Sequence, residues 1–211
     1  MKITIFSDVH GNLPALEKLL KEEPAADQYI FLGDAVNYGP WSNECVDLIA
    51  GLENCICIQG NHEQYYLDGA YGGPNKIAQE FFRFCFPGFS RQEEIRKYRP
   101  QWRYADYTCV HTILDKNIYP DTVLELDGNY FIGHSHHQFD TRSNGFILYN
   151  AGSVGQNRKY INFANYLNWF PEEGRVDSMG FIYDADLVIR EMKRLGYPEA
   201  CVDYYLSKER K

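Results

Sequence analysis

The chain has 211 residues, of which 45% are hydrophobic and 24% are charged. This length and composition are typical of one globular α/β domain. The formal net charge of −8 argues against a protein that binds long nucleic acids without specificity, because an acidic surface repels polyanions. A small anionic ligand stays compatible with this charge, since local cations can outweigh the field of the whole molecule.

Targeting signals and paired cysteines are not visible in the sequence. The apolar start of the chain breaks at Ser7, and no apolar run approaches the roughly 20 residues that span a bilayer. The six cysteines form no CxxC pair, which favours buried thiols over a zinc site. We therefore expect a cytoplasmic protein that does not bind membranes.

The N-terminal part of the chain alternates short apolar runs with segments of helical spacing. Strands are expected at residues 3–6, 29–32 and 55–58, with helices at 13–20 and 45–52 between them. This βαβαβ order predicts parallel strands that are joined by crossover helices.

The rest of the chain is richer in strands. Helices are expected at residues 75–86 and 91–98, then strands at 102–104, 107–110, 130–132, 146–149, 163–169 and 179–183, and closing helices at 185–195 and 199–206. Turn residues separate these strands, so this half is expected to be mostly antiparallel. We predict a single domain over residues 1–211, with two packed sheets flanked by helices and a helical insertion at about 64–100.

Polar side chains follow each of the first three predicted strands. Asp8 and His10 follow the first strand, Asp34 the second and Asn61 the third. Because the carboxyl ends of parallel strands meet at one edge of a sheet, these side chains are expected to converge. The spacing of Asp8 and His10 lets both point to the same side of an extended segment.

The histidines add to this cluster. All six, at positions 10, 62, 111, 134, 136 and 137, lie at or just past the ends of predicted strands, and none lies on a predicted helix. Taken singly, each polar residue has an ordinary structural role, such as a helix N-cap or a turn. Taken together, two carboxylates, one amide and four imidazoles suit first-row divalent ions. Seven ligands exceed one tetrahedral zinc and suit two ions about 3.5–4 Å apart that share a carboxylate.

Five short motifs carry a family resemblance. They are Asp8-x-His10, Gly33-Asp34, Gly60-Asn61-His62, the single His111 and Gly133-His134-x-His136. In this order they resemble the motifs of the calcineurin-like metallophosphoesterase superfamily. Residues 7–16, 33–40 and 150–156 are similar to segments of its small prokaryotic phosphodiesterase-like branch, and the resemblance is weakest at 64–105.

The resemblance implies a fold and a ligand set. The fold is α/β with α+β elements, a four-layer αββα sandwich of two mixed sheets. One metal ion is assigned to Asp8, His10, Asp34 and His136, and the other to Asp34, Asn61, His111 and His134, so that Asp34 bridges them. Mn²⁺ is the leading candidate for both ions, with Fe, Ni, Co and Zn as alternatives.

The implied reaction is hydrolysis of a small phosphodiester, phosphomonoester or nucleotide by in-line attack of a hydroxide that bridges the metals. His62 would face the leaving oxygen and supply its proton. Asn37 stands where many members carry an aspartate that orients this histidine, and Thr112 follows His111 where many carry glycine. Two alternatives from other classes are a catalytically weak or inactive scaffold with the same fold, and a nuclease.

Two further clusters have both structural and functional interpretations. Phenylalanines crowd residues 81–89, and packing within the insertion is favoured there over a substrate-stacking or self-association surface. Homo-oligomerisation therefore stays open. The basic stretch at 91–103 is favoured as a solvated helix face over a phosphate-recognition site, and His137 is expected to be an exposed neighbour of the ligands.

Overall fold

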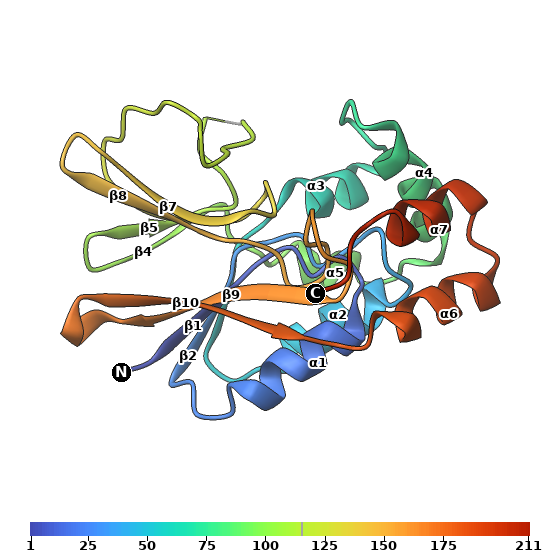
Figure 1. The fold of residues 1–211 in the computed structure, drawn as a ribbon, viewed down its shortest axis with the longest axis horizontal. Helices are drawn as coiled ribbons and strands as arrows, with labels where there is room; N and C mark the ends of the chain where they lie inside the picture. Colours follow the sequence, from blue (N-terminus) through green and yellow to red (C-terminus); the bar gives the residue numbers. More distant parts are fainter. Residues whose placement is uncertain (115) are drawn as a thin grey trace.

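The chain forms two stacked β-sheets with helices packed around them (Figure 1). The computed structural model describes residues 1–114 and 116–211. Each sheet has five strands, and each contains parallel and antiparallel pairs. The expected α/β architecture of two mixed sheets flanked by helices is therefore confirmed.

The first sheet holds the N-terminal strands. Its members are β1 (Ile3–Phe6), β2 (Gln28–Phe31), β3 (Cys55–Cys57), β9 (Phe163–Phe170) and β10 (Arg175–Ile182), in the order β10-β9-β1-β2-β3. The strands β1, β2 and β3 are parallel, and α1 (Leu13–Glu22) and α2 (Ser42–Ala50) connect them. The predicted βαβαβ unit is thus confirmed, whereas β10 begins earlier than expected.

The second sheet contains more parallel pairing than expected. Its members are β4 (Trp102–Tyr104), β5 (Tyr107–Cys109), β6 (Asn129–Ile132), β7 (Gln138–Ser143) and β8 (Phe146–Ala151), in the order β4-β5-β6-β8-β7. The pairs β5–β6 and β6–β8 are parallel, so the prediction of a mostly antiparallel half was wrong for them. The strand β7 was not predicted, because its sequence QFDTRS has only one large apolar residue.

Apolar side chains fill the space between the sheets and cover their outer faces. Ile5 of β1 and Leu32, which follows β2, pack together with Phe131 of β6 in one buried cluster. On the outer face of the second sheet, Ile118 and Leu126 pack together with strand residues. The side chains of β1 alternate between the two faces, so Phe6 joins the larger cluster under the helices.

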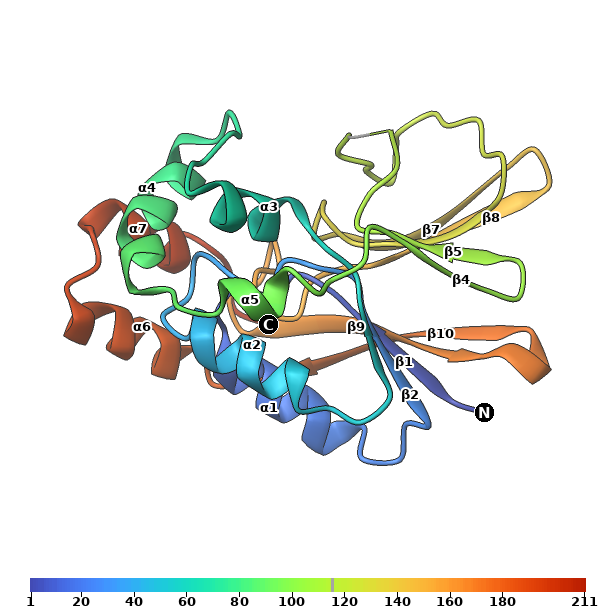
Figure 2. The ribbon, with the colours of Figure 1, turned by 180° about the vertical axis from the view of Figure 1, so that it is seen from behind.

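The remaining helices gather at the end of the sheets to which β1 and β2 lead (Figure 2). They are α3 (Asn61–Asp68), α4 (Lys76–Cys85), α5 (Gln92–Ile95), α6 (Ala185–Leu195) and α7 (Glu199–Leu206), with short 3₁₀ turns at Phe86–Gly88 and Pro171–Glu173. The helix α3 was not predicted, and α5 is shorter than expected. His62 lies in the first turn of α3, so the expectation that no histidine lies on a helix was wrong.

Several smaller predictions can be compared with the structure. Phe81 and Phe82 of α4 are buried, which agrees with packing inside the insertion. Arg91 pairs with Asp47 at the surface, as expected of a solvated basic stretch. Three cysteines are buried and three are partly buried, and all six are free thiols. No helix in the described part of the chain is long and apolar enough to cross a membrane.

Candidate metal centre

The loops after β1 and β2 are joined by backbone hydrogen bonds. The Asp8 amide donates to the carbonyl of Gly33 at 2.9 Å, and the His10 amide donates to the carbonyl of Asp34 at 2.9 Å. Since β1 and β2 are paired in parallel, both loops leave the same edge of the sheet. The convergence predicted from strand ends therefore has a direct cause in the pairing of these strands.

Six of the predicted site residues have a strained backbone. The φ angles of Asp8, His10, Asp34, Asn37, His134 and His136 lie between 50° and 73°, in the left-handed region that non-glycine residues rarely adopt. Such conformations each cost on the order of 1–3 kcal/mol and persist where the surrounding structure enforces them. They lie in the loops that follow β1, β2 and β6, where the proposed ligands gather.

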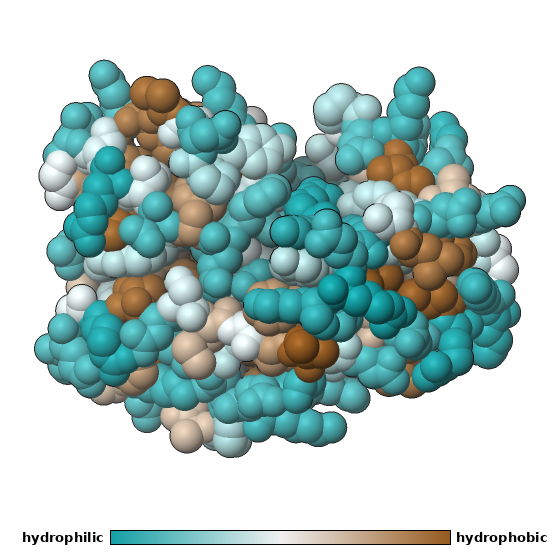
Figure 3. Space-filling model, in the orientation of Figure 1, coloured by the Kyte–Doolittle hydropathy of each residue, from teal (hydrophilic) through white to brown (hydrophobic). Residues whose placement is uncertain are grey.

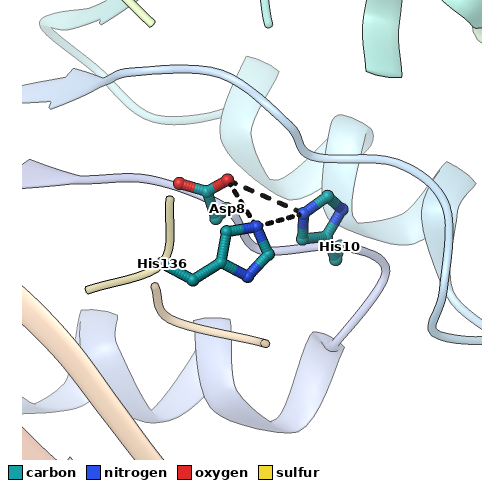
Figure 4. A group of neighbouring side chains, drawn as sticks. All are labelled: Asp8, His10 and His136. Atoms are coloured by element: carbon teal, nitrogen blue, oxygen red, sulfur yellow. Dashed lines mark hydrogen bonds and ion pairs between the residues drawn. The ribbon is translucent and has the colours of Figure 1, made fainter. Parts of the chain in front are cut away.

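The first cluster consists of Asp8, His10 and His136 (Figure 4). The Nε2 atom of His136 lies 3.0 Å from Oδ1 of Asp8 and 3.2 Å from Nε2 of His10. The Nε2 atom of His10 lies 3.7 Å from the same carboxylate oxygen. All three side chains are buried.

The second cluster forms around His111. Its Nε2 atom lies 3.2 Å from Oδ2 of Asp34, 3.1 Å from Oδ1 of Asn61 and 3.1 Å from Nδ1 of His134. The same Asp34 oxygen lies 3.8 Å from Nε2 of His10 in the first cluster. One carboxylate therefore faces both groups, and all seven predicted ligands are brought together.

Backbone carbonyls determine which nitrogen of three histidines faces inward. The Nδ1 atoms of His10, His111 and His136 donate to the carbonyls of Val36, Leu32 and Gln156 at 2.8, 2.7 and 2.7 Å, respectively. A carbonyl only accepts, so Nδ1 carries the proton and Nε2 points into the cluster. The same arrangement holds histidine ligands in metal proteins.

The chemistry of this donor set fits cations. Oδ1 of Asp8 is buried and has no hydrogen-bond partner among the described residues, although imidazole nitrogens surround it. Buried acceptors that face each other without a donor are unfavourable, and a shared divalent ion would satisfy them. A mixture of imidazole, carboxylate and amide donors suits a first-row metal ion.

The pKa values of His134 and His136 agree with this interpretation, whereas that of His111 in the metal-free protein does not. Burial, followed by the charge of Arg158, lowers the pKa of His136 to about 3. Burial, followed by the charge of His111, lowers the pKa of His134 to about 4. Both imidazoles are therefore neutral at pH 7, which is the state that binds metal. Burial would also lower the pKa of His111, but the adjacent Asp34 carboxylate outweighs it and raises that pKa to about 10. A metal ion would therefore have to displace a proton from the His111 ring.

Glu63 forms hydrogen bonds with the backbone of the two loops that follow β2 and β3. Its carboxylate accepts hydrogen bonds from the amides of Asp34 at 2.7 Å, Ala35 at 2.6 Å and Gly60 at 2.8 Å. Glu63 is fully buried, and burial, followed by the charge of Asp34, raises its pKa to about 7. A side chain at Gly60 would lie 2.2 Å from the Asp34 carboxylate, so glycine is required there. The sequence indicated neither role.

His62 lies beside the clusters and contacts Asn37. The Asn37 amide nitrogen lies 3.1 Å from Nδ1 of His62 and donates to the carbonyl of Ala78 at 3.2 Å. The Ala78 carbonyl orients the amide so that its N–H group faces His62, which leaves Nδ1 of His62 as the acceptor. Burial lowers the pKa of His62 to about 3, in agreement with a neutral ring.

A cavity of about 580 Å³ opens over the site. Predicted site residues on its wall are Asp34, Asn61, His62, His134 and His136. Other parts of the wall come from Tyr38, Tyr65, Tyr71, Pro74, Asn75, Thr112, Asn117, Tyr119 and Arg158. The surface is hollowed at its upper edge between the lobe that carries α4 and the lobe opposite (Figure 3). Sequence reasoning missed the tyrosines and Arg158, since tertiary packing alone brings them to the site.

Comparisons with known proteins agree with this geometry. The family model of the calcineurin-like phosphoesterases matches residues 1–190, so the chain belongs to this family of metal-dependent phosphoesterases. A solved metallophosphoesterase from Sphaerobacter thermophilus is 26% identical, with a TM-score of 0.82 and 98% of both chains covered.

Two curated relatives differ in how much of them is matched. An uncharacterized protein of Methanocaldococcus jannaschii is 28% identical, with 93% of this chain and 94% of the relative covered. The symmetrical bis(5′-nucleosyl)-tetraphosphatase of Methylococcus capsulatus is 38% identical, but the match covers 53% of this chain and only 42% of that enzyme. Since the match covers less than half of the tetraphosphatase, it does not carry that enzyme's substrate over to this chain.

Proposed function

We propose that this chain hydrolyses a small phosphoester or nucleotide with two divalent metal ions that share Asp34. The single observation that carries the proposal is the position of Oδ2 of Asp34, 3.8 Å from Nε2 of His10 and 3.2 Å from Nε2 of His111. A carboxylate between two histidine clusters is the arrangement that a dinuclear site needs.

The metal ions would be held by seven side chains. Asp8, His10, Asp34 and His136 would hold one ion, and Asp34, Asn61, His111 and His134 the other. When bound, such ions lower the pKa of water and neutralise charge on a phosphoryl group. Mn²⁺ is our candidate, because the mixed nitrogen and oxygen donors suit it.

His62 would act on the leaving group. A nitrogen of its ring lies within 4.8 Å of the ligand atoms of His10 and Asp34, and its ring lines the cavity. With Nδ1 occupied by Asn37, the proton of the neutral ring is on Nε2. To transfer a proton to the oxygen that departs without leaving an imidazolate, the ring must first become cationic, which the negative charge of a bound phosphoester would favour. Such a role typically contributes about 10²–10⁴-fold to the rate.

The aromatic wall of the cavity supports a nucleotide as substrate. Tyr65 and Tyr71 line the cavity, and their rings contact each other with centroids 4.8 Å apart. Nucleobases stack on aromatic side chains of this kind, at about 1–3 kcal/mol per base. The relatives named as bis(5′-nucleosyl)-tetraphosphatases point to the same class of substrate.

Turnover of bis(p-nitrophenyl) phosphate and p-nitrophenyl phosphate with added Mn²⁺ tests the proposal. We expect hydrolysis that stops when a chelator is added and resumes when Mn²⁺ is restored. Asp34→Asn should reduce the rate of hydrolysis at least about 10²-fold, because the shared anionic ligand is weakened. Absence of Mn²⁺-dependent hydrolysis of both esters would contradict the proposal and favour an inactive scaffold.

A further inference from the structure

Two cations lie beside the metal cavity. Arg158 lines the cavity over the metal centre and also a second cavity of about 480 Å³. The second cavity is further lined by His137, Lys159, Tyr204, Ser207, Lys208 and Glu209. The two cavities share Arg158, so this side chain faces both the metal centre and the cavity that Lys208 lines.

The C-terminal segment holds Lys208 in this position. The Glu209 amide donates to the carbonyl of Lys159 at 3.0 Å, and the Ile161 amide donates to the carbonyl of Glu209 at 2.8 Å. The chain after α7 therefore returns to the segment that leads into β9, where the C terminus lies in Figure 1. Both cations are fixed by tertiary pairing.

Side chains aim the two cations at the same region. The Arg158 guanidinium donates to the Tyr204 hydroxyl at 3.0 Å, and Nζ of Lys208 lies 4.7 Å from the centre of the Tyr204 ring. Nζ of Lys208 also donates to Oε1 of Gln156 at 2.8 Å. The backbone carbonyl of Gln156 accepts a hydrogen bond from Nδ1 of His136. Gln156 therefore contacts both Lys208 and a proposed metal ligand.

Among the described residues, neither Arg158 nor Lys208 is paired with a carboxylate, and the Glu209 carboxylate of the same cavity lies 3.9 Å from Nζ of Lys159. Among residues 1–114 and 116–211, no carboxylate oxygen lies within 4.0 Å of the charged nitrogens of Arg158 or Lys208, and both side chains are partly buried. Burial, followed by the charge of Arg158, lowers the pKa of Lys208 to about 7. Nε2 of Gln156, a buried donor, also has no partner among these residues. Partly buried cations without acidic partners are unfavourable, and a bound anion would compensate them.

We infer that Arg158 and Lys208 form a second anion subsite, which binds a phosphate adjacent to the one that is hydrolysed. The preferred substrate would then carry at least two linked phosphates, as in a nucleoside polyphosphate. A guanidinium group can donate two parallel hydrogen bonds to the oxygens of one phosphate, and an ammonium group adds a compact positive charge. The inference rests on the proposed function, because the metal centre defines where the first phosphate lies.

A matched pair of ligands tests the subsite. Calorimetric titration of the Mn²⁺-loaded protein with AMP and with α,β-methylene-ADP compares one phosphate with two on the same nucleoside. We expect the two-phosphate ligand to bind at least tenfold more tightly. Lys208→Gln and Arg158→Gln should each reduce this preference at least fivefold, and Arg158→Lys should restore part of it. Lys193→Gln, at an exposed lysine of α6, should keep the full preference.

The outcomes separate the subsite from the proposed function. A wild-type protein without preference for the second phosphate, or a preference that survives in both glutamine variants, would overturn the subsite. If Arg158→Gln does not fold, Lys208→Gln decides, because its side chain lies beyond the last helix. Hydrolysis of bis(p-nitrophenyl) phosphate by the same preparations reports on the proposed function independently. A preference without hydrolysis would refute that function and keep the subsite.

Discussion

At the scale of single residues, His62 distinguishes proton donation from charge stabilisation. We predict that His62→Ala keeps both metal ions and loses turnover, since the ring is not among the proposed ligands. The loss should be about 10²-fold or more for an alkyl phosphate ester, whose alkoxide leaves poorly without a proton. It should be smaller for an aryl ester such as p-nitrophenyl phosphate. Steady-state kinetics on the two esters, with metal analysis of the variant, provide the measurement.

The two esters also provide the control for this prediction. Equal losses on alkyl and aryl esters would mean that His62 stabilises charge on the phosphoryl group and does not donate a proton. Unchanged turnover of every ester would remove His62 from the mechanism. Loss of a metal ion would instead place the ring among the ligands.

Asn37 contacts Nδ1 of His62, so a charge at this position would act on the protonation of the ring. In Asn37→Asp, a carboxylate would accept a hydrogen bond from Nδ1 of His62, whereas the amide now donates to it. An adjacent anion favours the cationic ring, so the pKa of His62 should rise from its lowered value. The protonated form of a general acid is lost above its pKa. A higher pKa of His62 should therefore move the alkaline limb of the kcat profile to higher pH. A profile that stays in place would show that this limb does not report on His62.

At the scale of elements, the strand ends that carry the ligands could be predicted from the sequence, whereas the helix α3 could not. Asp8, Asp34 and Asn61 follow short apolar runs that form β1, β2 and β3, and the carboxyl ends of parallel strands meet at one edge of a sheet. The helix α3 has mostly polar residues with no clear apolar stripe, so its 3.6-residue period is weak. The Glu63 carboxylate accepts a hydrogen bond from the Gly60 amide, which is a local capping contact at the start of α3. It also accepts one from the Asp34 amide, which is a long-range contact that the sequence does not indicate.

Glu63 links the element α3 to the ligand loop. Burial, followed by the charge of Asp34, raises the pKa of Glu63 to about 7 in the metal-free protein, above the ordinary value of 4.5. A carboxyl with a raised folded pKa contributes stability below its unfolded pKa, and that contribution is lost as pH rises through the folded pKa. We predict that the stability advantage of wild type over Glu63→Gln, measured by urea unfolding without metal, decreases between about pH 4.5 and pH 7. An advantage that grows over this range would contradict the raised pKa.

The helix α4 anchors the insertion through Phe81. This side chain is fully buried between Tyr38 and the tyrosines of α7. We predict that Phe81→Ala lowers the free energy of unfolding by about 3–5 kcal/mol, because it leaves a cavity. Phe146→Ala, at a residue with 36% of its surface exposed, is the control and should cost much less. Equal effects would mean that the insertion packs loosely against the rest of the molecule.

At the scale of the whole molecule, we propose that residues 1–211 form one domain with the insertion as part of it. Chemical unfolding of wild type and Phe81→Ala should then each show one cooperative transition. Predicting the ligands was feasible because they lie at five strand ends whose order is read from the chain. Predicting Arg158, Lys208 and the tyrosine wall was not, because the return of the C-terminal segment to residues 159–161 is a long-range pairing.

The number of metal ions bound per chain tests the central claim most directly. Seven side chains arranged around a shared carboxylate predict that protein saturated with Mn²⁺ and then freed of unbound metal contains two ions per chain by elemental analysis. Asp34→Asn should lower the occupancy of both sites together, whereas Asp68→Asn, at an exposed carboxylate of α3, should leave both filled. A firm plateau at one ion per chain, with full activity, would contradict the dinuclear site.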